Sequence, residues 1–435
     1  MKLLATLALL LCVTGVRAKT VSVVDYGGVP DGVTSNTEAF KDAISALVKA
    51  DGGQLVVPAG VWLTGPIVLK SGIDLHLEKN AIIVMSPEKS EFLKDGKVVP
   101  GIRASKARNV SITGEGIIDG NGEWWRGVKR GKVSDTEWSA FRKMGGTVDD
   151  GGKIWYPFNL NHTANIAENA KAQEKMRTHL IRFTDCTGVR VSGVTVQNSP
   201  KFHIVPQRCQ DVVIENVTVR CPWNAQNGDG IDIMQCKDVK ITGCIVDVGD
   251  DGICMKGGGG AKALEAGPCE NILIENNIVY HAHGGFVIGS EFSGGMKNIV
   301  VRNNTFSGTD TGLRFKSGAG RGGKTEGIYI SDIYMTDIKD QAIVFETGYA
   351  DRPVGRENEV QEPSGTEFLP DFRDIHISRV TCRGTAVAIR AKGTIDMIHD
   401  ISVEDCVFFY TAAAIEIDDP DMITLTNVRF ETFPK

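Results

Sequence analysis

The sequence predicts an all-β protein: a single-domain, right-handed parallel β-helix with a short N-terminal capping helix. From Leu55 onward nearly every segment is a short β-rich run broken by Gly, Asn or Asp. Nine of these runs share one alternating apolar and polar pattern, and most of them recur every 22 to 33 residues. They begin at Val189, Val212, Val239, Ile272, Ile299, Ile328, Ile375, Ile401 and Ile423. Such repetition is typical of a solenoid whose coils pair with one another; a sandwich or a propeller is the alternative.

A stretch near the N-terminus carries the one clear amphipathic helix pattern, from Thr37 to Ala50. Its apolar residues recur at helical spacing, at Ala39, Phe40, Ala43, Ile44 and Leu47. We expect this helix to cover the open end of the solenoid. Before it, the residues from Val21 to Gly28 predict a strand that runs into a turn.

Asparagine and cysteine also follow the repeat. Asn216, Asn276, Asn303 and Asn427 occupy one offset, which predicts a hydrogen-bonded ladder inside a turn and argues against the sandwich and the propeller. Nine cysteines lie between Cys186 and Cys406 without metal-ligand spacing, and their pairing cannot be deduced from the sequence. Cys244 and Cys406 fall at matching positions, where buried thiols are favoured over a disulfide.

Two insertions interrupt the repeat. The first runs from Trp124 to about Met176, and the second, from Tyr349 to Phe372, lengthens one unit to 47 residues. Long loops on a solenoid usually form the walls of a binding site. The alternative is that they are disordered decoration.

The first 18 residues have the pattern of an export signal: a lysine, an apolar run, and a small-residue cleavage site at Ala18. The apolar run is too short to span a bilayer, so we expect no membrane span. The mature domain is then 19–435, exported to a periplasm or outside the cell. A formal charge of -6 with 23% charged residues describes an ordinary soluble protein and gives no reason to expect nucleic acid as a partner.

Four consecutive repeat units carry a cluster of polar residues. When the units are aligned on Gly230, Gly252, Gly285 and Gly312, one column reads Gly228, Asp250, His283 and Asp310, and the next reads Asp229, Asp251, Gly284 and Thr311. Stacked coils would place Asp229 beside Asp251, and His283 beside Asp250, about 4.8 Å apart. The glycines that flank the adjacent aspartates permit a bend through which both carboxylates reach one cleft.

Crowded carboxylates raise the pKa of at least one member, so that a neutral acid and an ionised base coexist. Hydrolysis of a glycosidic bond requires such a pair, one to protonate the leaving oxygen and one to activate water. The simpler explanation is that Asp-Gly pairs are common turns and that stacked aspartates bind calcium. Arg314 and Lys316 share one face of a strand beside these acids, where they would bind a carboxylate of an acidic sugar. His283 would orient the acid, or be a turn histidine without a role.

These four segments resemble the motifs of glycoside hydrolase family 28, the polygalacturonases and their relatives, whose solenoid is of the pectin-lyase-like kind. The motifs Asn-x-Asp, Gly-Asp-Asp, Gly-His-Gly and Arg-x-Lys match Asn227 to Asp229, Gly249 to Asp251, Ala282 to Gly284, and Arg314 to Lys316, with Ala282 in place of the first glycine of the third motif. The resemblance implies an inverting hydrolase of α-1,4-galacturonosidic bonds in pectin that needs no cofactor and no metal.

The resemblance also implies a role for each residue. Asp250 would be the general acid, Asp229 and Asp251 would activate water, and His283 would support the acid. Asn227, Arg314 and Lys316 are then the expected substrate-binding residues. Asp251 weakens a rhamnogalacturonan-hydrolase interpretation, because that branch often has Glu at this position.

The segments Gly289 to Glu291 and Arg321 to Gly323, together with the long insertions, are similar to the exo-acting bacterial branch. Large loops can block one end of a groove, so exo action, which releases galacturonic acid from chain ends, is favoured over endo action. Two rivals remain: a β-helical lyase that uses calcium, and a β-helical carbohydrate-binding or adhesion protein whose acids are only ladder residues.

Overall fold

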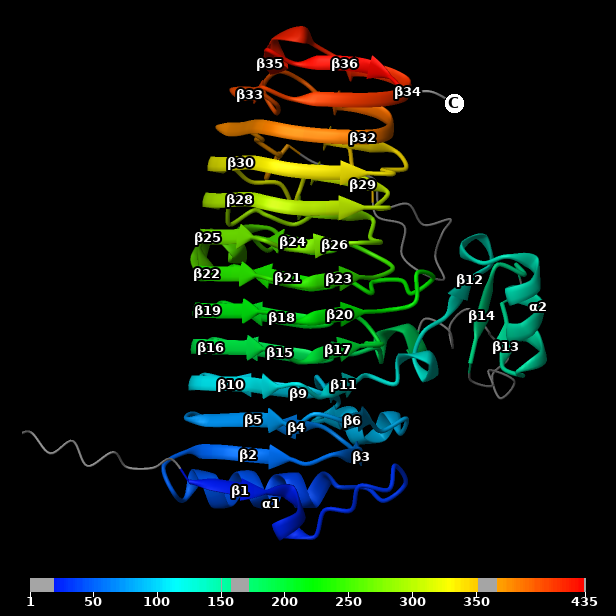
Figure 1. Ribbon diagram of the computed structural model, residues 1–435, viewed down its shortest axis with the longest axis vertical. Coiled ribbons are helices and arrows are strands. Elements are labelled where there is room, and N and C mark those ends of the chain that lie inside the picture. The colour runs from blue at the N-terminus through cyan, green and yellow to red at the C-terminus, as the bar shows by residue number, and fades with distance from the viewer. Residues whose placement is uncertain (1–18, 150, 158–171, 351–365, 434–435) are drawn as a thin grey trace, which may run out of the picture.

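Stacked parallel strands form the walls of a long solenoid that extends from α1 (Thr37–Val48) at one end to β36 (Arg429–Thr432) at the other (Figure 1). The computed structural model describes residues 19–149, 151–157, 172–350 and 366–433. Within these ranges 31 strands join in one continuous parallel sheet that coils on itself. Parallel connections of this kind are right-handed. The predicted right-handed parallel β-helix is therefore confirmed, while the predicted export signal lies outside the described residues.

The strands stack in three walls. The first consists of β1 (Thr20–Ser22), β2 (Gly53–Val57), β5 (Ile73–Leu77), β10 (Arg108–Gly114), β16 (Thr187–Ser192), β19 (Gln210–Glu215), β22 (Lys237–Thr242), β25 (Cys269–Glu275), β28 (Met296–Ser307), β30 (Thr325–Thr336), β32 (Ile375–Lys392), β33 (Ile401–Glu404) and β35 (Ile423–Thr426). The second consists of β3 (Gly60–Thr64), β6 (Ala81–Met85), β11 (Ile117–Asp119), β17 (Thr195–Gln197), β20 (Thr218–Arg220), β23 (Ile245–Asp247) and β26 (Ile278–Val279), and continues through the long strands to β34 (Val407–Ile417) and β36.

The third wall carries the polar cluster. It consists of β4 (Ile67–Val68), β9 (Ile102–Ser105), β15 (Ile181–Thr184), β18 (Ile204–Gln207), β21 (Ile231–Met234), β24 (Ile253–Lys256), β27 (Gly284–Gly289), β29 (Thr311–Lys316) and β31 (Gln341–Glu346). Four core residues stand in register on this wall and are at most 1% exposed: Ile231, Ile253, Phe286 and Leu313. Because side chains alternate along a strand, this inward column fixes which neighbours face outward.

The helix α1 closes the N-terminal end, as predicted, and buries the same five apolar residues that the helical spacing indicated. The strand before it is shorter than predicted. Only Thr20–Ser22 is extended, and Val23–Tyr26 forms a 3-10 turn that ends at Gly27 in the left-handed conformation, with φ of 82°. Ser22 caps this turn with its side chain, which stops the strand early.

The repeated asparagines are turn residues, because all four have a φ near +50° to +60°. Asn303 donates to Asn276 at 2.6 Å, so this part of the predicted ladder exists on the surface. A buried ladder lies one residue further along, where Asn277 donates to Asn304 at 3.0 Å. The two thiols at matching positions, Cys244 and Cys406, are buried and free, and so are the other seven cysteines of the described residues.

The first insertion builds a small unit beside the solenoid (Figure 1). Its antiparallel strands are β12 (Val128–Lys129), β13 (Thr147–Val148) and β14 (Ile154–Tyr156), with α2 (Asp135–Lys143) next to them. Of the second insertion, 351–365 lies outside the described residues. The remaining strands, β7 (Leu93–Lys94) and β8 (Lys97–Val98), form a hairpin, and the remaining α-helix of the described residues is the short α4 (Ala261–Ala266). In the part of the chain that the structure describes, no helix has the length and apolar character needed to cross a membrane.

Candidate active site

The predicted columns exist in the structure. Strand pairing aligns Ile231 with Ile253, and Ile253 with Phe286, while Gly284 pairs with Thr311. The residues just before these strands therefore stack as the sequence indicated, and the His283 N–H donates to the Asp250 carbonyl at 2.9 Å. The turns before β21, β24, β27 and β29 thus bring the polar residues to one surface.

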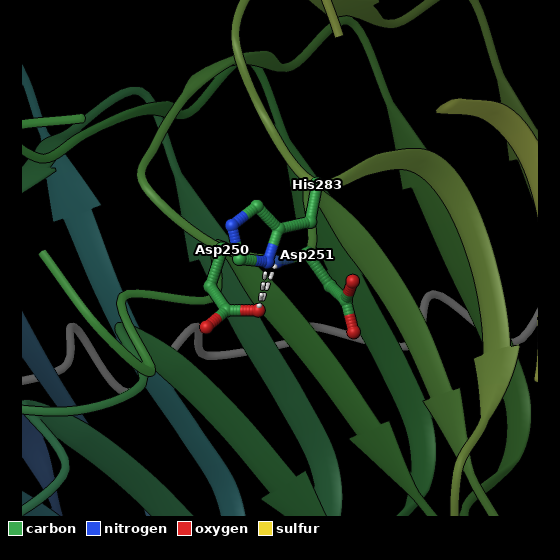
Figure 2. A group of neighbouring side chains, drawn as sticks. All are labelled: Asp250, Asp251 and His283. Carbon is green, nitrogen blue, oxygen red and sulfur yellow. Dashed lines mark hydrogen bonds and ion pairs between the residues drawn. The ribbon is translucent and has the colours of Figure 1, made fainter. Parts of the chain in front are cut away.

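Asp250 and His283 form the centre of this surface. Figure 2 shows the imidazole directed at the Asp250 carboxylate, with Asp251 beside them. His283 Nδ1 lies 3.0 Å from Asp250 Oδ1, and the other oxygen of Asp250 accepts the Asn227 N–H at 3.0 Å. Burial raises the pKa of Asp250, but the charge and hydrogen bond of His283, with the charges of Lys316 and Lys132, outweigh it, so the pKa is lowered overall.

Asp251 is held by the two predicted cations. Lys316 Nζ donates to Asp251 Oδ2 at 2.7 Å, and Arg314 Nη1 lies 3.4 Å from Asp251 Oδ1. Only 1% of Asp251 is exposed. Burial raises the pKa of this carboxyl, but Lys316 and then Arg314 outweigh burial and lower the pKa overall. Asp251 is therefore a fixed, ionised carboxylate.

Asp229 has the opposite character. It is 3% exposed, and burial, followed by the charges of Asp232 and Asp250, raises its pKa well above the ordinary value. The expected crowding effect therefore exists, at Asp229. Below it, Lys256 Nζ lies 3.8 Å from Asp229 and 3.5 Å from the fully buried Asp232. Burial raises the pKa of Asp232 to about 7, although Lys256 opposes the rise.

Lys132 reaches this site from the first insertion. Its ammonium lies 3.2 Å from His283 Nε2 and 3.3 Å from the Gly249 carbonyl. Burial lowers the pKa of Lys132, and Asp250 opposes this shift. The insertion thus brings a side chain to the surface that carries Asp250 and His283, while its role as a wall of a binding site stays a prediction. The sequence places Lys132 in the insertion, but no pattern in it places this residue beside His283.

The other predicted binding residues have partners within the protein. The Asn227 side-chain oxygen accepts a hydrogen bond from Arg177 at 2.9 Å. The ring of Tyr349, at the start of the second insertion, lies against Lys316 at 5.1 Å, Arg321 at 5.4 Å and Arg314 at 5.7 Å. These contacts leave the binding roles of Asn227, Arg314 and Lys316 as predictions.

Asp250, Asp251 and His283 are also the residues that could hold a metal ion, since each offers a ligand atom within 4.8 Å of the others. The chemistry of the donors argues against it. The ammonium of Lys316 already occupies Asp251 at 2.7 Å, and His283 already bonds Asp250. A calcium ion, which takes 6–8 oxygen ligands, would have to displace both partners.

The comparison with known families agrees with the motifs. Residues 131–389, more than half of the chain, match the model of glycosyl hydrolases family 28. The chain belongs to this family. Within family 28 it is similar to a protein named exo-poly-alpha-D-galacturonosidase from Dickeya chrysanthemi, at 28% identity over 86% of this chain and 64% of that protein. It is similar to a probable polygalacturonase of Vitis vinifera at 30% identity over 74% of this chain and 62% of that protein.

The aligned regions thus span less than two thirds of either relative. Among solved structures, an exopolygalacturonase from Thermotoga maritima superimposes with a TM-score of 0.76 at 30% identity, over 95% of this chain and 92% of that one. The likeness covers the whole solenoid of this family 28 protein.

Proposed function

We propose that this protein hydrolyses α-1,4-galacturonosidic bonds in pectic polygalacturonan and releases galacturonic acid from chain ends with inversion. One observation carries the proposal. A single surface combines a histidine-bonded carboxylate, Asp250, a second carboxylate fixed by two cations, Asp251, and a third with a raised pKa, Asp229. A structural ladder has no need for three carboxylates in such different electrostatic states.

In this proposal Asp250 protonates the glycosidic oxygen, while Asp229 and Asp251 position and activate the water. His283, Lys316 and Lys132 lower the pKa of Asp250, so substrate binding must raise this pKa for Asp250 to act as the acid. The substrate supplies the cause, because its own carboxylates and the exclusion of water both raise the pKa of a nearby acid. His283, at 3.0 Å, orients the carboxylate for the transfer.

Inversion requires that water attack from the face opposite the leaving group. The ligand atoms of Asp250 and Asp251 lie within 4.8 Å, less than the ~6.5–9.5 Å usual between the carboxyls of inverting enzymes. Asp251 is nevertheless a poor nucleophile, because Lys316 and Arg314 bond both of its oxygens. We therefore retain inversion, and proton NMR of the first product formed decides it: the β-anomer supports inversion, and the α-anomer contradicts it.

Two parts of the proposal, the acidic sugar and the exo mode, are supported by the residues that line the cleft. Arg314 is 17% exposed at its side chain, and a guanidinium has five N–H groups, so donors remain for a substrate carboxylate. The first insertion stands at one end of the site and sends Lys132 to His283. A wall at this point favours a pocket that accepts a chain end. An exported location, periplasmic or extracellular, is part of the proposal because pectin is a polymer outside the cell.

The test replaces the proposed acid. Asp250→Asn should reduce release of reducing ends from polygalacturonic acid by about 10³-fold or more, with folding and binding preserved, since the amide keeps the shape but cannot deliver the proton. Asp42→Asn, on the exposed face of α1, is the matched control and should retain full activity. Retained turnover in Asp250→Asn would remove Asp250 from the role of acid.

The two rivals give different results. A binding or adhesion protein releases no sugar with either the wild type or the variant. A calcium-dependent lyase loses activity with a chelator and forms unsaturated products that absorb ultraviolet light.

A further inference from the structure

Trp223 is an exposed aromatic ring that the protein holds in a fixed position. It follows β20 in the turn that leads to Asp229, and 60% of it is exposed. One face stacks on His281, with 4.2 Å between ring centroids and 5° between planes. Its Nε1–H donates to Asp247 Oδ1 at 2.8 Å. Both the tilt and the rotation of the ring are therefore set, although the ring is mostly exposed.

Trp223 lines a cleft of 1130 Å³ between the first insertion and the solenoid. Gly131 to Ser134 of the insertion form one side, and the ends of β11, β17, β20 and β23 form the other. Lys132 belongs both to this cleft and to the active site, because its ammonium contacts His283. The cleft is therefore continuous with the catalytic surface, and a sugar bound there could belong to the same polymer as the bond being cleaved.

The charge of this cleft differs from that of the Arg314 side of the site. Three basic residues line it: Arg126, Lys132 and Arg220. Arg126 bonds the Ser199 carbonyl, Lys132 contacts His283, and Arg220 is the strand partner of Asp247. Four acidic residues also line the cleft: Asp119, Glu123, Glu137 and Asp247.

Two of the acids, Asp119 and Asp247, accept hydrogen bonds from neutral donors, the Gln197 amide and the Trp223 ring. Neither is therefore neutralised by a cation at that bond. A galacturonate carboxylate entering the cleft would meet more negative than positive charge. An uncharged pyranose has no such cost, since the C–H groups on one of its faces pack on an aromatic ring while its hydroxyls bond the carboxylates and amides around it.

We propose that Trp223 is the platform of a subsite for an uncharged pyranose unit of the pectin chain, next to the catalytic carboxylates. The unit is either a methyl-esterified galacturonate or a neutral sugar carried by the polymer, since both present an apolar face without a carboxylate. This subsite rests on the proposed function, because it assumes that a pectin chain is bound with one end in the active site.

The experiment compares Trp223→Ala with the wild type on three polymers: polygalacturonic acid, its partly methyl-esterified form, and a galacturonan substituted with xylose. We expect KM to rise about fivefold to tenfold on at least one uncharged form and by less than about twofold on polygalacturonic acid. Trp223→Phe should restore part of the affinity, because it retains a flat ring. The matched control is Tyr329→Ala, which removes another exposed ring stacked on a histidine, His376, outside this cleft.

Each outcome of this comparison either supports or overturns the proposed subsite. A rise confined to the esterified polymer assigns the subsite to methyl-galacturonate, and a rise confined to the xylose-substituted polymer assigns it to a neutral sugar. An equal rise on polygalacturonic acid contradicts an uncharged ligand, and unchanged KM on all three overturns the subsite. If the wild type cleaves none of the polymers, the proposed function fails. Equilibrium binding of the same polymers then tests Trp223: weaker binding by Trp223→Ala supports the platform, and equal binding overturns it.

Discussion

Replacing Lys316 with methionine tests whether this residue first of all holds Asp251. The ammonium is 2.7 Å from Asp251 Oδ2, and the two residues are 5% and 1% exposed. Removing one partner of a buried ion pair usually costs about 3–5 kcal/mol of unfolding free energy, because the other charge stays buried without compensation. Arg314 still contacts the other oxygen at 3.4 Å. We therefore expect Lys316→Met to cost about 3 kcal/mol, the lower end of that range.

The assay is a double-mutant cycle measured by urea unfolding. It uses the wild type, Lys316→Met, Asp251→Asn and the double variant at neutral pH. The double variant no longer contains the uncompensated carboxylate, so its loss should be smaller than the sum of the single losses by about 2 kcal/mol or more. If the two losses add within about 0.5 kcal/mol, the pair is not coupled, and the assignment of Lys316 as the group that fixes Asp251 is wrong.

Three further predictions concern Asp232, Lys132 and Asn277. Burial and then the charge of Asp232 raise the pKa of Asp229, so Asp232→Asn should lower the pKa of Asp229. If Asp229 activates water, the acid limb of the kcat–pH profile should move to lower pH. Movement of the alkaline limb instead would make Asp229 the acid. Lys132→Met removes the amine that contacts His283 Nε2, and should lower kcat about tenfold with little change in KM. Lys143→Met, at an exposed position of α2, is the control, and an effect on KM alone would give Lys132 a binding role. Asn277→Ala removes the side-chain acceptor of the buried Cys244 N–H, while Asn304 keeps the backbone N–H of residue 277 as a donor. It should cost about 2 kcal/mol in urea unfolding, whereas a loss below about 0.5 kcal/mol would show that this part of the ladder is dispensable.

The stacking of the candidate catalytic residues could be predicted because the repeat itself encodes it. Each of the four turns ends in a glycine followed by apolar strand residues, and a slip of one residue would turn the buried column outward. The alignment on Gly230 and its three equivalents therefore predicts the neighbours of Asp250 and Asp251. The same alternation places Arg314 and Lys316 on one face of the strand, and the alternating residues Leu313 and Phe315 are buried.

Lys256, Asp232 and Lys132 lie next to the predicted site residues but were not predicted from the sequence, for two different reasons. Lys256 was within reach of sequence reasoning, since it follows Cys254 by two residues and so shares its outward face on β24. Asp232 pairs with Cys254 on the adjacent strand and faces the same way. Lys132 had no such signal: it lies outside the repeat, and only the folded insertion brings it to a histidine 151 residues away. Trp223 sits in a turn, where sequence alone does not show what the ring packs against.

The distribution of pKa shifts could also not be predicted from the sequence. Three aspartates crowd together in the motif, yet the raised pKa falls on Asp229 and the lowered ones on Asp250 and Asp251. The difference comes from which cations reach which oxygen, and these cations belong to distant strands and to the insertion. The motif spacing identifies the titratable groups, whereas the packing of the folded chain determines which of them has a raised pKa.

A time course of products from polygalacturonic acid, resolved by size and run with a chelator present, tests the central claim most directly. The account predicts monomeric galacturonic acid from the first time point, a slow loss of viscosity, and no effect of the chelator, because the proposed catalytic groups are carboxylates and the proposed pocket limits entry to chain ends. A ladder of oligomers with a rapid loss of viscosity would contradict exo action. Products that form only without the chelator, and that absorb ultraviolet light as unsaturated sugars do, would contradict hydrolysis itself.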